Sequence, residues 1–95
     1  MNKPEVTLLK KGVVFKILQV TGEKDMQMLK HISTKEAVIV IEEGNAIIEI
    51  ASRERLLKKG DSMIIPAAVP HSLLVMTSLK AIVMMPVESE IEFIN

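Results

Sequence analysis

The chain has 95 residues, of which 48% are hydrophobic and 25% charged, and twelve basic side chains balance twelve acidic ones. Zero net charge and an aromatic content of 2% argue against nucleic-acid binding, which needs basic surfaces and stacking side chains. The lack of cysteine excludes disulfides, thiolate metal sites and thiol catalysis. No apolar run approaches the roughly 18 residues of a membrane span, and the N-terminus has no apolar signal core. We therefore expect one domain over residues 1–95, located in the cytoplasm.

Short apolar runs separated by turn residues follow one another along the chain. They predict strands over residues 13–20, 26–31, 37–41, 46–51, 55–58, 63–65, 71–76 and 79–85. The turns between them recur about every 8–12 residues, which is typical of all-β sandwiches and barrels. No segment shows helical periodicity over about ten residues, so no core helix is expected. Residues 88–95 alternate weakly and fit either an edge strand or a short helix.

Gly44 lies between two of these apolar runs. Because Gly44-Asn45 suits positive φ angles, it predicts a hairpin, and Thr77-Ser78 predicts a turn near the end of the chain. Several runs are apolar at consecutive positions, whereas a half-solvated antiparallel strand alternates. Strands of this kind need cover on both faces, from terminal strands or from a second copy of the chain. We therefore expect a homodimer.

The stretch GDSMIIPAAVPHSLLV, which begins at Gly60, resembles the second sequence motif of the cupins. That motif reads Gly, five residues, Pro, one residue, Gly, two residues, His, three residues, Asn. Gly60, Pro66 and His71 stand at the family spacing, while Ala68 replaces the second Gly and Val75 replaces the Asn. The match is fairly specific, because the surrounding pattern of turns and strands agrees with it.

The first cupin motif is matched in part. His31, the four residues ISTK and Glu36 fit its second His and its Glu, while Leu29 stands where the first His is usual. Seven residues rather than six separate Glu36 from Gly44. The resemblance implies an all-β fold, a cupin-type double-stranded β-helix or jelly-roll barrel, with antiparallel strands in two sheets.

In cupins that bind metal, the two motifs supply ligands from the inward faces of neighbouring strands. The resemblance therefore implies His31, Glu36 and His71 as ligands of divalent iron, manganese, nickel or zinc. Three protein ligands leave coordination positions of the metal open. A metal-free pocket is the alternative, because a third imidazole is missing. Strand parity places the side chains of Leu29 and His31 on one face, pointing inward. The predicted pocket residues are Leu29, Val38, Val40, Met63, Ile65, Leu73 and Val75.

Three functions are compatible with this pattern. The first is a module that binds a small, mostly apolar molecule in the barrel, with an optional divalent metal. The second is a metal-dependent oxygenase or isomerase that uses His31, Glu36 and His71. The third is a structural or assembly protein that acts through apolar outer faces. The scarcity of other acid–base groups favours the first, leaves catalytic residues unassigned, and makes a small-molecule ligand and a second copy the expected partners.

Overall fold

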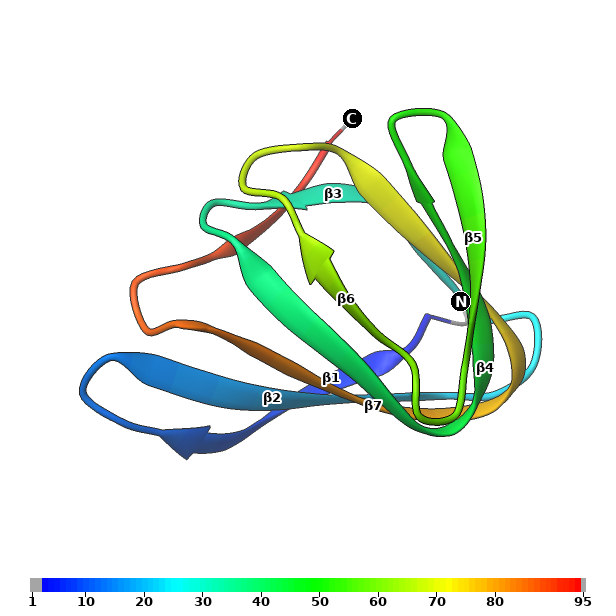
Figure 1. Cartoon of the computed structure of the whole chain (residues 1–95), viewed down its shortest axis with the longest axis horizontal. Helices are drawn as coiled ribbons and strands as arrows, with labels where there is room; N and C mark the ends of the chain where they lie inside the picture. The colour runs from blue at the N-terminus through cyan, green and yellow to red at the C-terminus, as the bar shows by residue number, and fades with distance from the viewer. Residues whose placement is uncertain (1–2, 95) are drawn as a thin grey trace.

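The computed structural model describes residues 3–94, and within that range it contains eight strands and no helix (Figure 1). The strands are β1 (Glu5–Lys11), β2 (Phe15–Gly22), β3 (Gln27–Ser33), β4 (Ala37–Ile50), β5 (Arg53–Lys58), β6 (Ser62–Ile65), β7 (His71–Pro86) and β8 (Ile91–Phe93). The expected all-β class is thereby confirmed. Among these residues no helix is long and apolar enough to cross a membrane.

The two long strands β4 and β7 organise the barrel. They pair antiparallel from Val38 opposite Met84 to Ile50 opposite His71. In one half of the barrel the strands pair in the order β1, β2, the end of β7, the start of β4, and β6. In the other half the order is β8, β3, the start of β7, the end of β4, and β5. These halves correspond to the two expected sheets, and β4 and β7 join them into one curled antiparallel sheet. The arrangement is that of a jelly-roll barrel.

The predicted hairpin at Gly44 and the turn at Thr77-Ser78 are wrong, since both sites are bends within continuous strands. Gly44 adopts a φ of 76°, and the pairing of β4 with β7 shifts register around it. A Cβ at Gly44 would collide with the backbone oxygen of Ser78, so the close crossing of the two bends requires glycine. The amide of Asn45 donates to Thr77 Oγ1 at 3.1 Å, which ties one bend to the other.

The chain ends and the short loops complete the barrel. β1 lies outside every predicted strand, and the strand predicted over residues 13–20 instead covers Phe15–Gly22. The C-terminal segment forms β8, the edge-strand alternative, paired with β3. The turn from β4 to β5 is Ala51-Ser52, and both residues have positive φ angles, as a tight two-residue hairpin requires.

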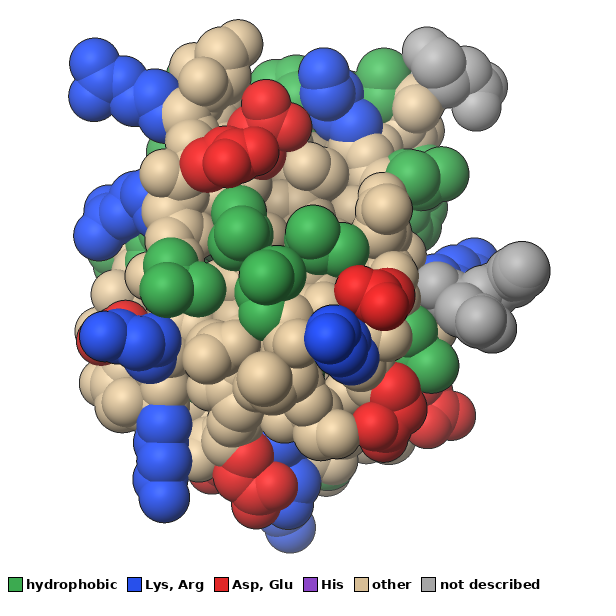
Figure 2. Space-filling model, turned by 90° about the vertical axis from the view of Figure 1, so that its right-hand side faces the viewer, with side chains coloured by type: hydrophobic (Ala, Val, Ile, Leu, Met, Phe, Trp, Pro, Cys, Tyr) green, Lys and Arg blue, Asp and Glu red, His purple; other side chains and the backbone are tan. Residues whose placement is uncertain are grey.

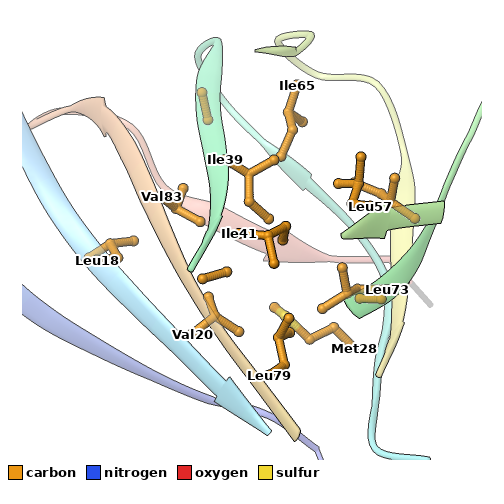
Figure 3. Packing of buried hydrophobic residues seen from close by; sticks show 14 of the residues in the cluster. Leu18, Val20, Met28, Ile39, Ile41, Leu57, Ile65, Leu73, Leu79 and Val83 are labelled. Atoms are coloured by element: carbon orange, nitrogen blue, oxygen red, sulfur yellow. The ribbon is translucent and has the colours of Figure 1, made fainter. Parts of the chain in front are cut away.

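The hydrophobic core fills the interior of the barrel. Along β4 and β7, buried residues alternate with half-buried ones, so one face of each strand points inward. Figure 3 shows core side chains from different strands converging, and strand register places Leu18 of β2 and Ile39 of β4 on either side of Val83 of β7. The apolar residues between the buried ones lie on the outer face, where the structure leaves them partly exposed.

Candidate ligand-binding cavity

His31 and His71 meet inside the barrel although forty residues separate them. They are direct partners in the pairing of β3 with β7, which places both side chains on the same face of the sheet. Their ring centroids are 4.2 Å apart with an interplanar angle of 63°. Phe93 of β8 is the partner of His31 on its other side, with ring centroids 5.2 Å apart. The row of three rings is therefore set by strand register.

Each histidine ring is oriented by a backbone carbonyl two residues earlier in the chain. His31 Nδ1 donates to the oxygen of Leu29 at 2.6 Å, and His71 Nδ1 donates to the oxygen of Val69 at 3.0 Å. A carbonyl oxygen can only accept, so Nδ1 must carry the hydrogen in both rings. In a neutral ring the Nε2 atom then holds a free lone pair, which can accept a hydrogen bond or bind a metal.

The surroundings of the two rings favour the neutral form. His31 and His71 are 5% and 4% exposed. Burial away from water lowers the pKa of both, because a charged imidazolium loses its hydration there. The hydrogen bonds to Leu29 and Val69 oppose this shift, and the neighbouring His71 lowers the pKa of His31 further. At neutral pH both rings are therefore uncharged.

The rings border a cavity of about 50 Å³ in the barrel. Its walls are Val6, Leu18, Val20, Met28, His31, Ser33, Ala37, Ile39, Ile48, Ile65, His71, Leu73, Val83, Met85 and Ile91. Among the described residues, the polar side chains of the walls are those of His31, His71 and Ser33, and none of the walls is charged. This volume exceeds the roughly 10–15 Å³ that one water needs and is smaller than the roughly 150 Å³ of a cavity that takes benzene.

Ser33 is the feature of the cavity that most needs a partner. Its side chain is buried, with 3% exposure, and within residues 3–94 its Oγ atom makes no hydrogen bond. An unbonded buried hydroxyl costs about 1–3 kcal/mol, so such groups in proteins usually face a ligand or an ordered water. The hydroxyl and the two imidazoles together make a polar end in an otherwise apolar space.

A second, larger hollow lies outside the cavity. Its volume is about 380 Å³, and Lys3, Pro4, Glu5, Val6, Met28, Ile91 and Phe93 line it. Val6, Met28 and Ile91 line both spaces, so the cavity and the hollow adjoin at these three apolar side chains. Met28 is unbranched and adaptable, so its side chain can adjust its packing between the two spaces.

The structure brings together two of the three predicted metal ligands. Glu36 lies exposed in the loop between β3 and β4, and no group of three His, Cys, Asp or Glu side chains suited to a metal occurs among residues 3–94. The cavity therefore offers two imidazole nitrogens without the carboxylate that would complete the expected set. Among residues 3–94, His31 and His71 alone therefore do not make the expected three-ligand site.

The predicted pocket residues are placed differently from one another. Ile65 and Leu73 line the cavity, Val75 is fully buried in the core beside it, and Met63 packs against that core. Leu29 is 68% exposed, because a bulge between Met28 and His31 breaks the alternation that strand parity assumes. Met28 points inward in its place.

Val38 and Val40 lie on the outer face of β4, and Ala37 and Ile39 line the cavity instead. The reason is that both faces of this strand are apolar, so hydrophobicity alone does not distinguish them. Sequence reasoning also missed Ser33, although it lies two residues after His31 and shares its face of β3. That spacing was the available signal for it.

Comparison with known proteins places the chain in a family. A family model described as "Cupin domain" matches residues 10–87. Among curated proteins no significant match was found. The structural neighbours include a conserved protein of unknown function, SPY1581, from Streptococcus pyogenes, with 18% identity and a TM-score of 0.77. The alignment covers 99% of this chain and 77% of that one.

Two further neighbours show how widely the fold is used. A cupin superfamily protein, DSY2733, from Desulfitobacterium hafniense DCB-2 has 15% identity and a TM-score of 0.81, covering 92% of this chain and 80% of that one. Salicylate 1,2-dioxygenase from Pseudoaminobacter salicylatoxidans has 15% identity and a TM-score of 0.80, covering 85% of this chain but 24% of the enzyme. Identities this low show a common fold and leave the function to be argued from the site.

Proposed function

The chain belongs to the cupin domain family, and on that basis we propose that it binds a small, mostly apolar molecule inside its barrel. The observation that carries the proposal is the hydroxyl of Ser33, which has no partner among residues 3–94 and belongs to an apolar cavity that two imidazoles also line. Ligand pockets typically combine apolar walls with a few convergent polar groups that fix orientation. The cavity has this composition at a small scale.

The proposal is tested by nuclear magnetic resonance on metal-free protein, with 1-butanol as the probe. Methyl signals of the cavity walls Ile39, Ile48 and Val83 should shift to saturation, while those of the outward-facing Leu56 and Ile64 should stay in place. Ala37→Leu, which fills the cavity, should abolish the shifts. Ala67→Leu, the same change on an exposed loop, should leave them intact. Shifts that persist in Ala37→Leu would place the ligand elsewhere and overturn the proposal.

A metal-dependent oxygenase or isomerase is the second candidate, and the orientation of the two histidines favours it. Histidines that bind metal usually donate their other ring N–H to a carbonyl or carboxylate, as His31 and His71 do here. A bound divalent metal would supply open positions for a substrate or dioxygen. Glu36 lies outside the cavity, so among the described residues this candidate has only His31 and His71 as protein ligands.

Elemental analysis separates the two candidates. Untagged protein is incubated with iron, manganese, nickel and zinc in turn and then dialysed. Stoichiometric metal that disappears in His71→Ala supports the enzyme, and absence of all four metals removes it. Binding of 1-butanol by the metal-free protein is expected in either case, so the first proposal does not depend on this result.

We also propose that the chain forms a homodimer through the outer face of one half of the barrel. Strand register places Ile64, Val38, Met84 and Ile17 in one row across β6, β4, β7 and β2, and Val40 lies opposite Ile82 in the next. Ile64 is 51% exposed. With zero net charge, two copies do not repel each other as highly charged chains do.

The other half of the barrel has a narrower apolar surface. There Leu56, Ile47 and Leu74 share one row. On the side of the molecule that carries β5, Figure 2 shows a small hydrophobic group surrounded by acidic and basic side chains. Light scattering on a dilution series tests the dimer, with Ile64→Lys expected to give a monomer and Leu56→Lys expected to leave the dimer intact. A wild-type monomer at micromolar concentration would contradict the dimer and count against an assembly role.

A further inference from the structure

We propose that the cavity selects an uncharged ligand carrying a hydrogen-bond donor, such as an alcohol or an amide, over a carboxylate or an ether of the same size. The inference rests on the proposed function and adds the chemical class of the ligand. It follows from the hydrogen-bonding capacity of His31, His71 and Ser33, and from the lack of charge in the cavity walls among the described residues.

The two imidazoles present acceptors to the cavity. Their Nδ1 hydrogens are already used by the carbonyls of Leu29 and Val69, and a lone pair remains on each Nε2. Two acceptors beside each other cannot satisfy one another. A ligand that enters this space therefore gains most if it donates a hydrogen bond, and a ligand that only accepts leaves both nitrogens unpaired.

Ser33 complements the imidazoles. Its hydroxyl both donates and accepts, and it has no partner among residues 3–94. An alcohol oxygen can donate its hydrogen to one imidazole nitrogen and accept the hydrogen of the Ser33 hydroxyl. One ligand atom of this kind therefore satisfies two protein groups at once, which an ether oxygen cannot do.

The walls exclude a charged head group. No lysine or arginine of the described residues lines the cavity, and the Nδ1 hydrogens of the two buried histidines are already bonded to the carbonyl oxygens of Leu29 and Val69. A carboxylate moved into such a space would lose its hydration without gaining a counter-charge. An ammonium group would meet two acceptors, but it would also be stripped of water without any carboxylate to pair with.

The dimensions define how the ligand lies. The cavity of about 50 Å³ takes the polar group and a few carbons, while the outer hollow of about 380 Å³ lies beyond Val6, Met28 and Ile91. An apolar tail would pass between these three side chains toward Phe93. The ligand is thus a short or slender molecule with its donor at the inner end.

Three matched probes test the inference on metal-free, full-length protein at pH 7.5. 1-Butanol and diethyl ether are isomers that differ in having a donor, and butyrate replaces the hydroxyl carbon by a carboxylate. Dissociation constants are measured from the shifts of the cavity methyls. We expect 1-butanol to bind about tenfold more tightly than diethyl ether, which is the effect of one good hydrogen bond, and butyrate to show no saturation.

Two serine variants locate the effect. Ser33→Ala should reduce the preference for 1-butanol over diethyl ether to about twofold, while Ser62→Ala, on the exposed face of β6, should preserve it. Binding of ether or butyrate as tight as that of 1-butanol would overturn the inference and leave the proposed function standing. The absence of saturable shifts with all three probes would overturn both.

Discussion

Replacing Ser33 by alanine should stabilise the folded chain when no ligand is present. Among residues 3–94 no protein group bonds the buried hydroxyl, so folding costs hydration of about 1–3 kcal/mol without a protein hydrogen bond in return. Alanine removes that cost but leaves a small void, which offsets about 0.5–1 kcal/mol. The net gain is about 1 kcal/mol, equivalent to a rise in Tm of about 4–8 °C for a chain of this size.

Urea denaturation measures this gain most cleanly. The protein is refolded from denaturant first, so that no co-purified molecule occupies the cavity. With an m value of about 1–3 kcal/mol/M, the midpoint should rise by about 0.3–1 M at constant m. Ser62→Ala, at an exposed position, should change stability by less than about 0.5 kcal/mol. A loss of 1 kcal/mol or more in Ser33→Ala would refute the reasoning, because it would mean that the hydroxyl is already bonded in the folded chain.

Further substitutions test the two glycines with positive φ angles, Ala68 in the loop between β6 and β7, and the histidines. Gly60→Ala should lower the free energy of unfolding by about 1–2 kcal/mol, because Gly60 has a φ of 90° but no atom near the added Cβ. Gly44→Ala should cost at least about 2 kcal/mol more, because its Cβ would meet the backbone of β7. Equal losses of stability in urea denaturation would contradict the close crossing at Gly44. Ala68→Gly should stabilise by up to about 1 kcal/mol, because Ala68 has a φ of 61°, and a lower Tm would contradict this. The pKa values of His31 and His71 are lowered in the folded chain, so the unfolded chain binds more protons below about pH 6.5. The contribution of the two histidines to stability should therefore be full above that pH and fall on acidification, by at most about 1.4 kcal/mol per pH unit for each histidine. His71→Gln should reduce this slope. A slope unchanged from wild type would contradict a lowered pKa of His71 in the folded chain.

Much of the fold could be predicted from the sequence. The spacing of short apolar runs indicated an all-β chain, and the motif with Gly60, Pro66 and His71 indicated the cupin barrel, which the structure and the family match confirm. The two histidines were expected as partners, and strand register brings them into contact. These features depend on local turn chemistry and on residue spacing, which a single sequence displays directly.

The rest depends on geometry that residue types do not reveal. Gly44 permits a tight hairpin and a bend within a strand equally well, and only the crossing with β7 selects the bend. The bulge after Met28 turned Leu29 outward, and the apolar character of both faces of β4 concealed which face is internal. Glu36 matched its motif in spacing, yet it lies in an exposed loop that the spacing could not describe.

The polar end of the cavity can be observed directly through the ring nitrogens of His31 and His71. Long-range ¹H–¹⁵N spectra of the metal-free protein at pH 7.5 report which nitrogen of each ring carries hydrogen. Both rings should be neutral with hydrogen on Nδ1, and both Nε2 signals should move with the cavity methyls as 1-butanol is added, giving one dissociation constant. Charged rings, hydrogen on Nε2, or imidazole signals that stay fixed while the methyls shift would contradict a ligand site built on these two histidines.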